Sequence, residues 1–420
     1  MALYSSKPKL TKMKPILLLI ILNLILISCE TAKKSEYQKS EQVEEDDETP
    51  FWDEQQKGAN YFNATPTEEW FDAALNTNIK FIRLTYEKWE GEQRDFLLGN
   101  ADDYQGIVES DFQKLIYYLD YAHKLNINIV ITPITLPGAR WVQMNGNKRD
   151  NRLWTDVKYQ KQAEQFWKDL ATRLKHHPAI VGYNILNEPY PEVVYKKYSF
   201  WDGELVNWYE DVKGGVGDLN MFYNGVVNAI RSIDKVTPII VESGLFSTPW
   251  AFEYLTPIED ENIIYSFHMY EPYVFTTKRI NKGRYRYPDK MYIEDLGAEF
   301  QLDKEGLAEF LKPIQNWSDK YQIPSNQIWV GEFGCNRHIE GVENYLQDLI
   351  SIFNEHNWHW SFYAYREDVW EAMDYELGKE KVFHKYWEFQ DSNSLHFHYD
   401  DIYGRVKDNS LWNVFKKEFK

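Results

Sequence analysis

The chain has 420 residues, enough to bury one large hydrophobic core or two smaller ones. Its 43% hydrophobic and 27% charged residues are typical of a globular protein, and its formal net charge of −18 argues against nucleic acid or an anionic membrane surface as a binding partner. The 16 Trp and 30 Tyr would suit the faces of sugar rings, but they would equally fill a large core.

The first 28 residues are predicted to be a lipoprotein signal peptide. A basic segment precedes the apolar run of residues 16–27, which is shorter than the roughly 20 residues that span a bilayer but suits a signal peptide. Residues 26–29 resemble a bacterial lipobox, in which Cys29 would carry the lipid; a secretory signal with an incidental cysteine is the alternative. We therefore expect a lipid anchor in the bacterial cell envelope, at the outer membrane, the cell surface or the periplasm.

Residues 29–50 are predicted to be an acidic, flexible tether. They are polar and end in the acidic run of residues 44–48, so they lack the apolar side chains that a core needs. From Phe51 to the end of the chain we find neither a linker nor an internal repeat. Residues 51–420 are therefore expected to form one globular domain, with a length that suits an elaborated (β/α)8 barrel.

Apolar runs typical of buried strands alternate with segments of helical periodicity along this domain. A capping box at Thr65 and a cap at Ser110, paired with Gln113, are predicted to open the first two helices. This alternation predicts a closed (β/α)8 TIM barrel, and an open doubly wound sheet is disfavoured because no Gly-rich phosphate loop follows a strand. Extended loops are expected after strands four and six, at residues 191–217 and 270–300. The predicted strands are 58–62, 79–86, 127–134, a run ending at Glu188, 238–242, 263–268, a run ending at Glu332, and 358–365; the predicted helices are 65–76, one from Ser110, 157–174, 219–233, 307–321 and 342–353.

Two of the strand-like stretches end in a glutamate beside a chain-turning residue. Residues 182–189 read GYNILNEP and contain Glu188, and residues 328–334 read IWVGEFG and contain Glu332. A buried parallel strand that delivers one carboxylate to its carboxyl end has this pattern. Because the two glutamates are far apart in the sequence, the fold must bring them together. Two carboxyl groups that face one cleft are what the cleavage of a glycosidic bond requires.

The residues around these glutamates extend the pattern. Asn187 directly precedes Glu188, and residues 266–272, SFHMYEP, place His268 and Tyr270 at the end of strand six. In these motifs, and in their order, the sequence resembles glycoside hydrolase family 5, the cellulase-like family of retaining β-glycosidases. The resemblance extends over about residues 57–375, almost the whole predicted domain.

The resemblance implies a role for each matching residue. Glu188 would be the catalytic acid/base and Glu332 the catalytic nucleophile, while Arg83 on strand two, Asn187, His268 and Tyr270 would bind substrate or position these acids. From the residues alone, His268 could instead be a core histidine and Arg83 a surface ion-pair partner.

Two features depart from the family's pattern. The end of strand three, residues 131–138, lacks the histidine that many members carry there. For the aromatic floor at the end of strand eight the sequence offers Trp360 or Tyr363, and we favour Tyr363. Trp141 could be a further sugar platform or a core residue, and residues 366–370 could line the cleft or only pair charges.

We therefore expect a retaining glycoside hydrolase that acts on a β-linked polysaccharide of the β-glucan or β-mannan type, without a cofactor or metal. The alternatives are an exo-acting β-glucosidase or β-mannosidase that acts on oligosaccharides, and a non-catalytic carbohydrate-binding surface lipoprotein. The basic loop at residues 278–287 could meet a charged sugar or pair with nearby acids.

Overall fold

The computed structural model describes residues 50–195, 204–293, 297–367, 370, 372–379 and 408–420. The predicted signal peptide, the predicted lipidation site Cys29 and the predicted tether up to residue 49 lie outside the described residues. Within the described ranges, no helix has the length and apolar character that crossing a membrane requires.

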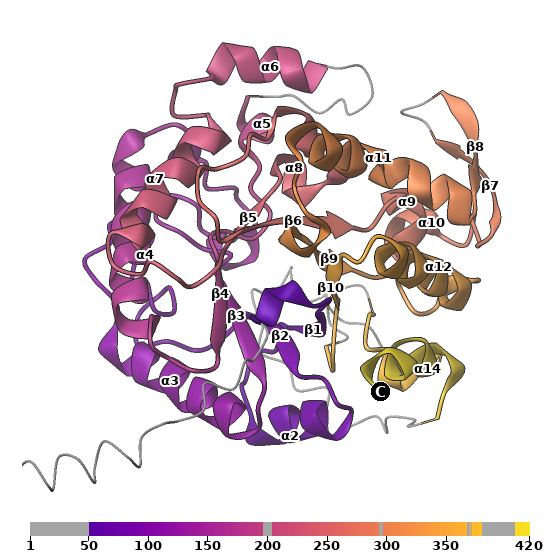
Figure 1. Ribbon diagram of the computed structural model, residues 1–420, viewed down its shortest axis with the longest axis horizontal. Helices are drawn as coiled ribbons and strands as arrows, with labels where there is room; N and C mark the ends of the chain where they lie inside the picture. The colour runs from indigo at the N-terminus through magenta and orange to yellow at the C-terminus, as the bar shows by residue number, and fades with distance from the viewer. Residues whose placement is uncertain (1–49, 196–203, 294–296, 368–369, 371, 380–407) are drawn as a thin grey trace, which may run out of the picture. The chain divides into compact units, whose positions relative to one another are not determined.

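Eight parallel strands form a closed barrel, which confirms the predicted fold class (Figure 1). Going around the barrel, the order of the strands is β1-β10-β9-β6-β5-β4-β3-β2. Neighbouring strands pair in parallel, as where Arg83 of β2 lies opposite Val130 of β3. The strand bounds are β1 Lys57–Tyr61, β2 Phe81–Thr85, β3 Asn128–Thr132, β4 Ile180–Asn184, β5 Ile239–Glu242, β6 Ile263–Met269, β9 Ile328–Phe333 and β10 His359–Phe362.

The barrel interior changes from apolar to polar along its axis. Successive residues of a strand point to opposite faces, so Phe81, Arg83 and Thr85 of β2 share one face. Phe81 belongs to a buried apolar cluster near the amino ends of the strands, with Trp52, Val130, Ile240, Ile264 and Trp329. Two residues further along, Arg83 and Glu242 are both fully buried. The same alternation therefore places charged side chains at the carboxyl ends of the strands.

Helices surround the barrel and bury their apolar faces against it (Figure 1). Two predicted caps are wrong. The first helix is capped by Thr67, whose side chain accepts from the Trp70 N–H, and not by Thr65. The next begins at Glu109 without a side-chain cap, because the Ser110 hydroxyl contacts Glu92 instead. The principal helices are α2 Glu68–Asn76, α3 Glu109–Lys124, α4 Val157–Leu174, α7 Leu219–Arg231, α11 Lys304–Tyr321, α12 Val342–Glu355 and α14 Ser410–Lys416.

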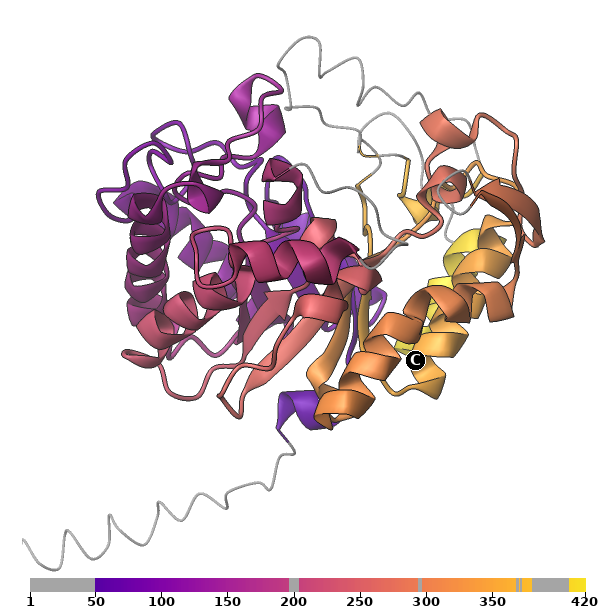
Figure 2. The ribbon, with the colours of Figure 1, turned by 90° about the horizontal axis from the view of Figure 1, so that it is seen from above.

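The extended loops follow β4 and β6, as predicted. The first contains α5 Pro191–Val194 and α6 Glu204–Val212; the second contains α9 Tyr273–Thr276, α10 Lys278–Asn281 and the antiparallel hairpin of β7 Asp289–Ile293 and β8 Ala298–Leu302. In both ribbon views the hairpin lies beside α11 (Figures 1 and 2), and the rings of Phe300 and Phe310 pack there with centroids 5.0 Å apart. A short turn, α8 Gly244–Ser247, and the 3-10 helix Pro249–Tyr254 follow β5.

Candidate active site

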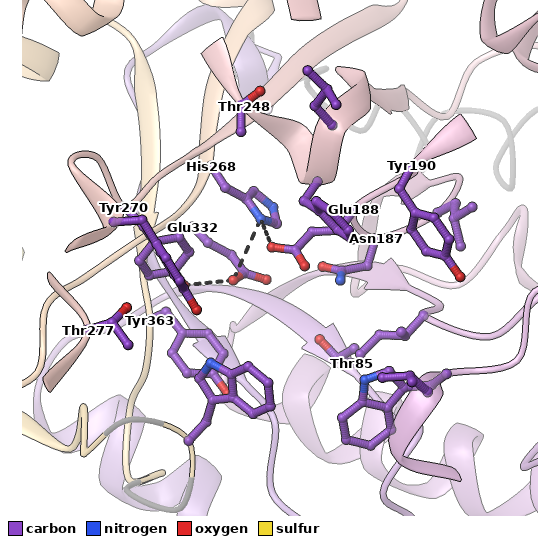
Figure 3. Close-up of a pocket in the computed structure, with 18 of the residues that line it drawn as sticks. Thr85, Asn187, Glu188, Tyr190, Thr248, His268, Tyr270, Thr277, Glu332 and Tyr363 are labelled. Carbon is purple, nitrogen blue, oxygen red and sulfur yellow. Dashed lines mark hydrogen bonds and ion pairs between the residues drawn. The ribbon is translucent and has the colours of Figure 1, made fainter. Parts of the chain in front are cut away.

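The two predicted glutamates converge at the carboxyl ends of the barrel strands (Figure 3). Glu332 lies on β9, and Glu188 follows β4 in a left-handed backbone conformation, with φ of 50°. One oxygen of each glutamate and one ring nitrogen of His268 all lie within 4.8 Å of one another. The fold therefore brings together the carboxylates that the sequence separates.

The Arg83 side chain joins Glu332 to two further side chains, those of Glu242 and Asn187. One guanidinium nitrogen, Nη1, donates to Glu332 Oε1 at 2.6 Å, while Nη2 donates to Glu242 Oε1 and Asn187 Oδ1, both at 2.7 Å. Arg83 is fully buried, so it is not a surface residue. Burial opposes its charge, but Glu242 and Glu332 outweigh that effect and raise the pKa of Arg83.

Glu242 is a central member of the cluster that we did not assign from the sequence. Its Oε2 accepts from the Glu188 backbone N–H at 2.8 Å and from Ser247 Oγ at 2.5 Å. Although burial opposes ionisation, His268 and Arg83 hold the pKa of Glu242 well below its ordinary value. The signal was present, because the predicted strand 238–242 is an apolar run ending in an acid, like those that end at the other two glutamates.

His268 stands between the three carboxylates. Its Nδ1 lies 2.9 Å from Glu188 Oε1 and 3.7 Å from Glu332 Oε2, and its Nε2 lies 3.5 Å from Glu242 Oε2. Burial disfavours the charged ring, but Glu332 and Glu242 raise the pKa of His268 to about 10. The ring is therefore protonated at neutral pH, and Nδ1 donates to Glu188.

The surroundings of Glu188 and Glu332 differ in the charge that they favour. The Glu188 side chain is 34% exposed to the cavity. Desolvation within the pocket and the charges of Glu332 and Glu242 raise its pKa, although His268 opposes them. Glu332 accepts from Tyr270 Oη at 2.8 Å as well as from Arg83, and donors of this kind stabilise negative charge. Burial and Glu332 raise the pKa of Tyr270 well above its ordinary value, so its hydroxyl remains a donor.

Glu188, His268 and Glu332 could each offer one ligand atom to a metal ion. In the arrangement observed, however, Glu332 Oε1 accepts from Arg83 and Glu332 Oε2 accepts from Tyr270. A protonated histidine has no lone pair for a metal. The donor set therefore suits proton transfer between a carboxylic acid and a substrate better than cation binding.

A cavity of about 720 Å³ opens above the glutamates. Tyr363 and Trp141 both line it, and Trp141 packs against the ring of Phe62 with centroids 5.3 Å apart. The aromatic lining suits the apolar faces of sugar rings. The side chains of residues 278–287 take no part in the lining, and Arg286 pairs with Asp289. The aromatic residues of the lining are Phe62, Trp141, Trp154, Tyr190, Phe246, Trp250, Tyr270, Tyr273, Phe310, Tyr363 and Trp370.

Of residues 366–370, Asp368 and Val369 lie outside the described residues, and the others combine the two roles considered for this segment. Trp370 lines the cavity. Glu367 is buried and pairs with the buried Lys88, at 3.2 Å, and it also accepts from the Tyr363 hydroxyl at 3.3 Å. The ion pair of Glu367 and Lys88 therefore contacts the hydroxyl of Tyr363, whose ring lines the cavity.

Trp360 does not line the cavity. It is fully buried among outer elements, where its indole N–H donates to Asn354 Oδ1 at 3.2 Å and its ring packs against Phe333 and Phe419. Its neighbour Ser361 has the opposite orientation and donates to the Gly331 carbonyl of the adjacent strand β9. The alternation of side chains along β10 thus excludes Trp360 from the floor of the site, and leaves Tyr363 there.

A closed (β/α)8 barrel with a cavity and paired carboxylates at the carboxyl ends of its strands is typical of glycosidases. The family model described as Cellulase (glycosyl hydrolase family 5) matches residues 44–368. The chain therefore belongs to glycosyl hydrolase family 5 and is a glycoside hydrolase, as the sequence motifs predicted.

Several curated proteins and solved structures are similar to the chain. It is 22% identical to endoglucanase C of Acetivibrio thermocellus, over 76% of this chain and 88% of that protein. It is also 22% identical to a beta-xylosidase of Phanerodontia chrysosporium, over 74% of this chain and 58% of that protein. Among solved structures, endoglucanase Cel5A of Thermotoga maritima superposes with a TM-score of 0.55 at 19% identity, covering 74% of this chain and 89% of that one. At this identity the superposition shows a shared fold.

Proposed function

We propose that the chain is a retaining glycoside hydrolase of a β-linked polysaccharide, with Glu188 as the acid/base and Glu332 as the nucleophile. The observation that carries the proposal is the separation of the two carboxyl groups, whose oxygens approach within 4.8 Å. Retaining glycosidases hold these groups about 5–5.5 Å apart, whereas inverting enzymes leave about 6.5–9.5 Å for a water molecule.

In the first step, an oxygen of Glu332 attacks the anomeric carbon and the bond to the leaving oxygen breaks. Glu188 gives its proton to that oxygen, and a glycosyl ester forms on Glu332. In the second step, Glu188 takes a proton from water, and the resulting hydroxide oxygen attacks the anomeric carbon and releases Glu332. Arg83 and Tyr270, which donate to Glu332, stabilise the carboxylate before attack and after release.

The electrostatics explain how Glu188 could serve both steps. Burial raises its pKa in the free enzyme, and the negative charge of Glu332 raises it further against the opposing effect of His268, which favours the protonated form that must act as the acid. Formation of the glycosyl ester removes the Glu332 charge. The pKa of Glu188 then falls, which favours the carboxylate that must accept a proton from water.

For the substrate we propose a β-glucan or β-mannan. The relatives named endoglucanase support the first, and the Thermotoga maritima structure with mannotriose substrate, with a TM-score of 0.54 at 19% identity over 74% of this chain and 90% of that one, supports the second. Product sizing on glucans, mannans and xylans tests this choice. Internal cleavage of a glucan or mannan is expected, whereas release of single sugars from chain ends would indicate an exo-acting glycosidase.

The mechanism is tested with Glu188→Gln and Glu332→Gln, and with Glu309→Gln as an exposed control. Each active-site variant is expected to lose several orders of magnitude in kcat, while the control remains active. A 2-deoxy-2-fluoroglycoside should add one glycosyl mass to Glu332, as read by peptide mass spectrometry. Near-wild-type hydrolysis by either variant, or inversion of the first product by NMR, would refute the assignment.

We further propose that Cys29 is lipidated and holds the enzyme at the bacterial cell envelope. The lipobox-like residues 26–29 after a basic and apolar leader support this anchor. In cells fed a labelled fatty acid, the wild-type protein should take up label and sediment with membranes. The Cys29→Ala variant should do neither; equal labelling of both proteins would contradict the proposal.

A further inference from the structure

We infer that Arg149, Tyr190 and Phe246 form a subsite for an anionic substituent, a carboxylate or a sulfate, on the leaving-group side of the substrate. The inference rests on the proposed function, because it assigns part of the cavity to the sugar that Glu188 protonates. It adds a charge preference to the site, which the family assignment does not supply.

The three side chains form one platform in the cavity wall. The rings of Tyr190 and Phe246 stack with centroids 5.2 Å apart and an interplanar angle of 24°. The Arg149 guanidinium carbon lies 5.8 Å from the first centroid and 5.7 Å from the second. All three residues line the cavity. Stacking on aromatic faces orients a guanidinium and leaves its N–H groups available to a ligand.

The charge of Arg149 is not neutralised within the described part of the chain. The other arginines of this region are paired: Arg140 donates twice to Asp95, at 2.8 Å each, and Arg152 donates to Asp150 at 2.7 Å. No described carboxylate bonds to Arg149 in this way. In a chain of net charge −18, one uncompensated guanidinium in the cavity wall offers an anion a local attraction that the protein as a whole does not.

The loop after β5 fixes the platform in place. Leu245 and Phe246 both have left-handed backbones, with φ of 49° and 61°, a conformation that non-glycine residues disfavour. The Phe246 N–H donates to the Pro189 carbonyl at 3.1 Å, and the Leu245 N–H donates to the buried Glu192 at 3.0 Å. The loops after β4 and β5 are thus joined, so Phe246 is held against Tyr190.

The platform lies on the side of the cavity that a leaving group would occupy. Tyr190 follows Glu188 by two residues, and Figure 3 shows it on the side of Glu188 away from Glu332. The nucleophile contacts the sugar that stays, and the acid protonates the oxygen of the sugar that leaves. A leaving sugar could therefore stack on the aromatic pair while its anionic group accepts two N–H bonds from Arg149. Bidentate recognition of this kind is what the guanidinium geometry favours.

The test compares wild type, Arg149→Gln and Arg149→Lys on three oligosaccharides: a neutral one, one with a uronic acid on the leaving side and one with a sulfated sugar there. Arg149→Gln should lower kcat/KM on the anionic substrates about threefold to tenfold, since Arg149 is exposed and solvent screens a charge-assisted pair there, and it should leave the neutral substrate unchanged. Arg149→Lys should keep part of the preference. The anionic oligosaccharide on which Arg149→Gln loses more activity shows whether the subsite prefers a carboxylate or a sulfate.

Two controls separate this subsite from general effects. Lys148→Gln removes one positive charge from the residue that precedes Arg149. Lys148 is exposed and does not line the cavity, so this variant should behave as wild type. Aryl glycosides, which place no sugar on the leaving side, should be cleaved equally by wild type and Arg149→Gln. Thermal unfolding checks that the variants fold.

Equal effects of Arg149→Gln on neutral and anionic substrates would overturn the inference, and so would equal effects of Lys148→Gln and Arg149→Gln. Failure of the proposed function would look different, because no neutral glycan would then be hydrolysed. In that case, calorimetric binding of the same oligosaccharides decides: equal affinities of wild type and Arg149→Gln for both anionic ones would overturn the subsite.

Discussion

Replacement of Glu242 by glutamine is the sharpest test of the charge network around Glu188 and Glu332, the proposed catalytic pair. Glu242 is fully buried, and each of its oxygens accepts a short bond, one from Arg83 at 2.7 Å and one from the Glu188 backbone N–H at 2.8 Å. A glutamine has only one oxygen, so its amide nitrogen must face one of these donors. Glu242→Gln thus leaves a buried donor unpaired and removes the negative charge that compensates Arg83 and protonated His268.

The expected loss is about 4 kcal/mol in the free energy of unfolding. Breaking a buried ion pair costs about 3–5 kcal/mol, and this range already includes the roughly 1–3 kcal/mol that an unpaired buried donor costs. For a domain of this length, such a loss lowers Tm by roughly 5 °C. The variant should also lose about a hundredfold in kcat, because Glu188 and His268 are both positioned by Glu242 and small displacements of catalytic groups are that costly.

The pH dependence of the loss has a defined sign. The depressed pKa of Glu242 contributes stability above the ordinary value of 4.5, and this contribution is lost as the pH falls. The raised pKa of His268 contributes stability below its ordinary value of 6.5, and this is lost as the pH rises through about 10. The difference in stability between wild type and Glu242→Gln should therefore be greatest between about pH 4.5 and 6.5 and smaller near pH 10.

Urea unfolding at several pH values measures this difference, with Glu309→Gln as an exposed control expected to change stability by less than about 0.5 kcal/mol. Imidazole NMR should show a lower pKa of His268 in the variant. A Glu242→Gln protein with wild-type stability at pH 5.5, or a difference that does not change with pH, would refute the network described above.

Three further substitutions test the positions of individual side chains. Tyr270→Phe removes one donor to Glu332 and should slow formation of the glycosyl ester about tenfold to a hundredfold, as measured by the burst phase with an aryl glycoside; an unchanged burst rate would show that this bond is dispensable. Trp360→Phe should cost about 1–2 kcal/mol of stability through the lost bond to Asn354 without changing KM, whereas Tyr363→Ala should raise KM; a raised KM in Trp360→Phe alone would reverse the assignment of the floor.

The fold could be predicted because buried parallel strands leave long apolar runs in the sequence. The run at 263–268 became β6 Ile263–Met269, and the periodic segment 157–174 became α4 Val157–Leu174. The caps were harder to place, because Thr65 and Thr67 flank the same proline and either could precede the helix. Only the extended backbone at Thr67, which aims its side chain at the Trp70 N–H, decides between them.

The site was only partly predictable, for reasons of register and of loop geometry. The motifs placed Glu188 and Glu332 in one cavity, but sequence alone could not show that Glu242 turns inward to join them. Trp360 and Tyr363 were both reasonable candidates until the facing directions along β10 were known. The platform of Arg149 depends on contacts between three separate loops, which follow no periodic pattern in the sequence.

The charges in the site balance in both halves of the proposed reaction. In the free enzyme, Arg83 and His268, both with raised pKa values, face Glu242, whose pKa is lowered, and Glu332, which must be an anion to attack; burial raises the pKa of Glu188. Once Glu332 becomes an ester and Glu188 has given up its proton, the same two cations face two anions again. The negative charge has moved from one catalytic glutamate to the other, and His268 contacts both. The net charge of the buried cluster is therefore the same in both halves of the reaction, and neither half requires an unpaired buried ion, whose desolvation would be costly. Glu242 is the anion that stays in place throughout, and its charge makes this balance possible.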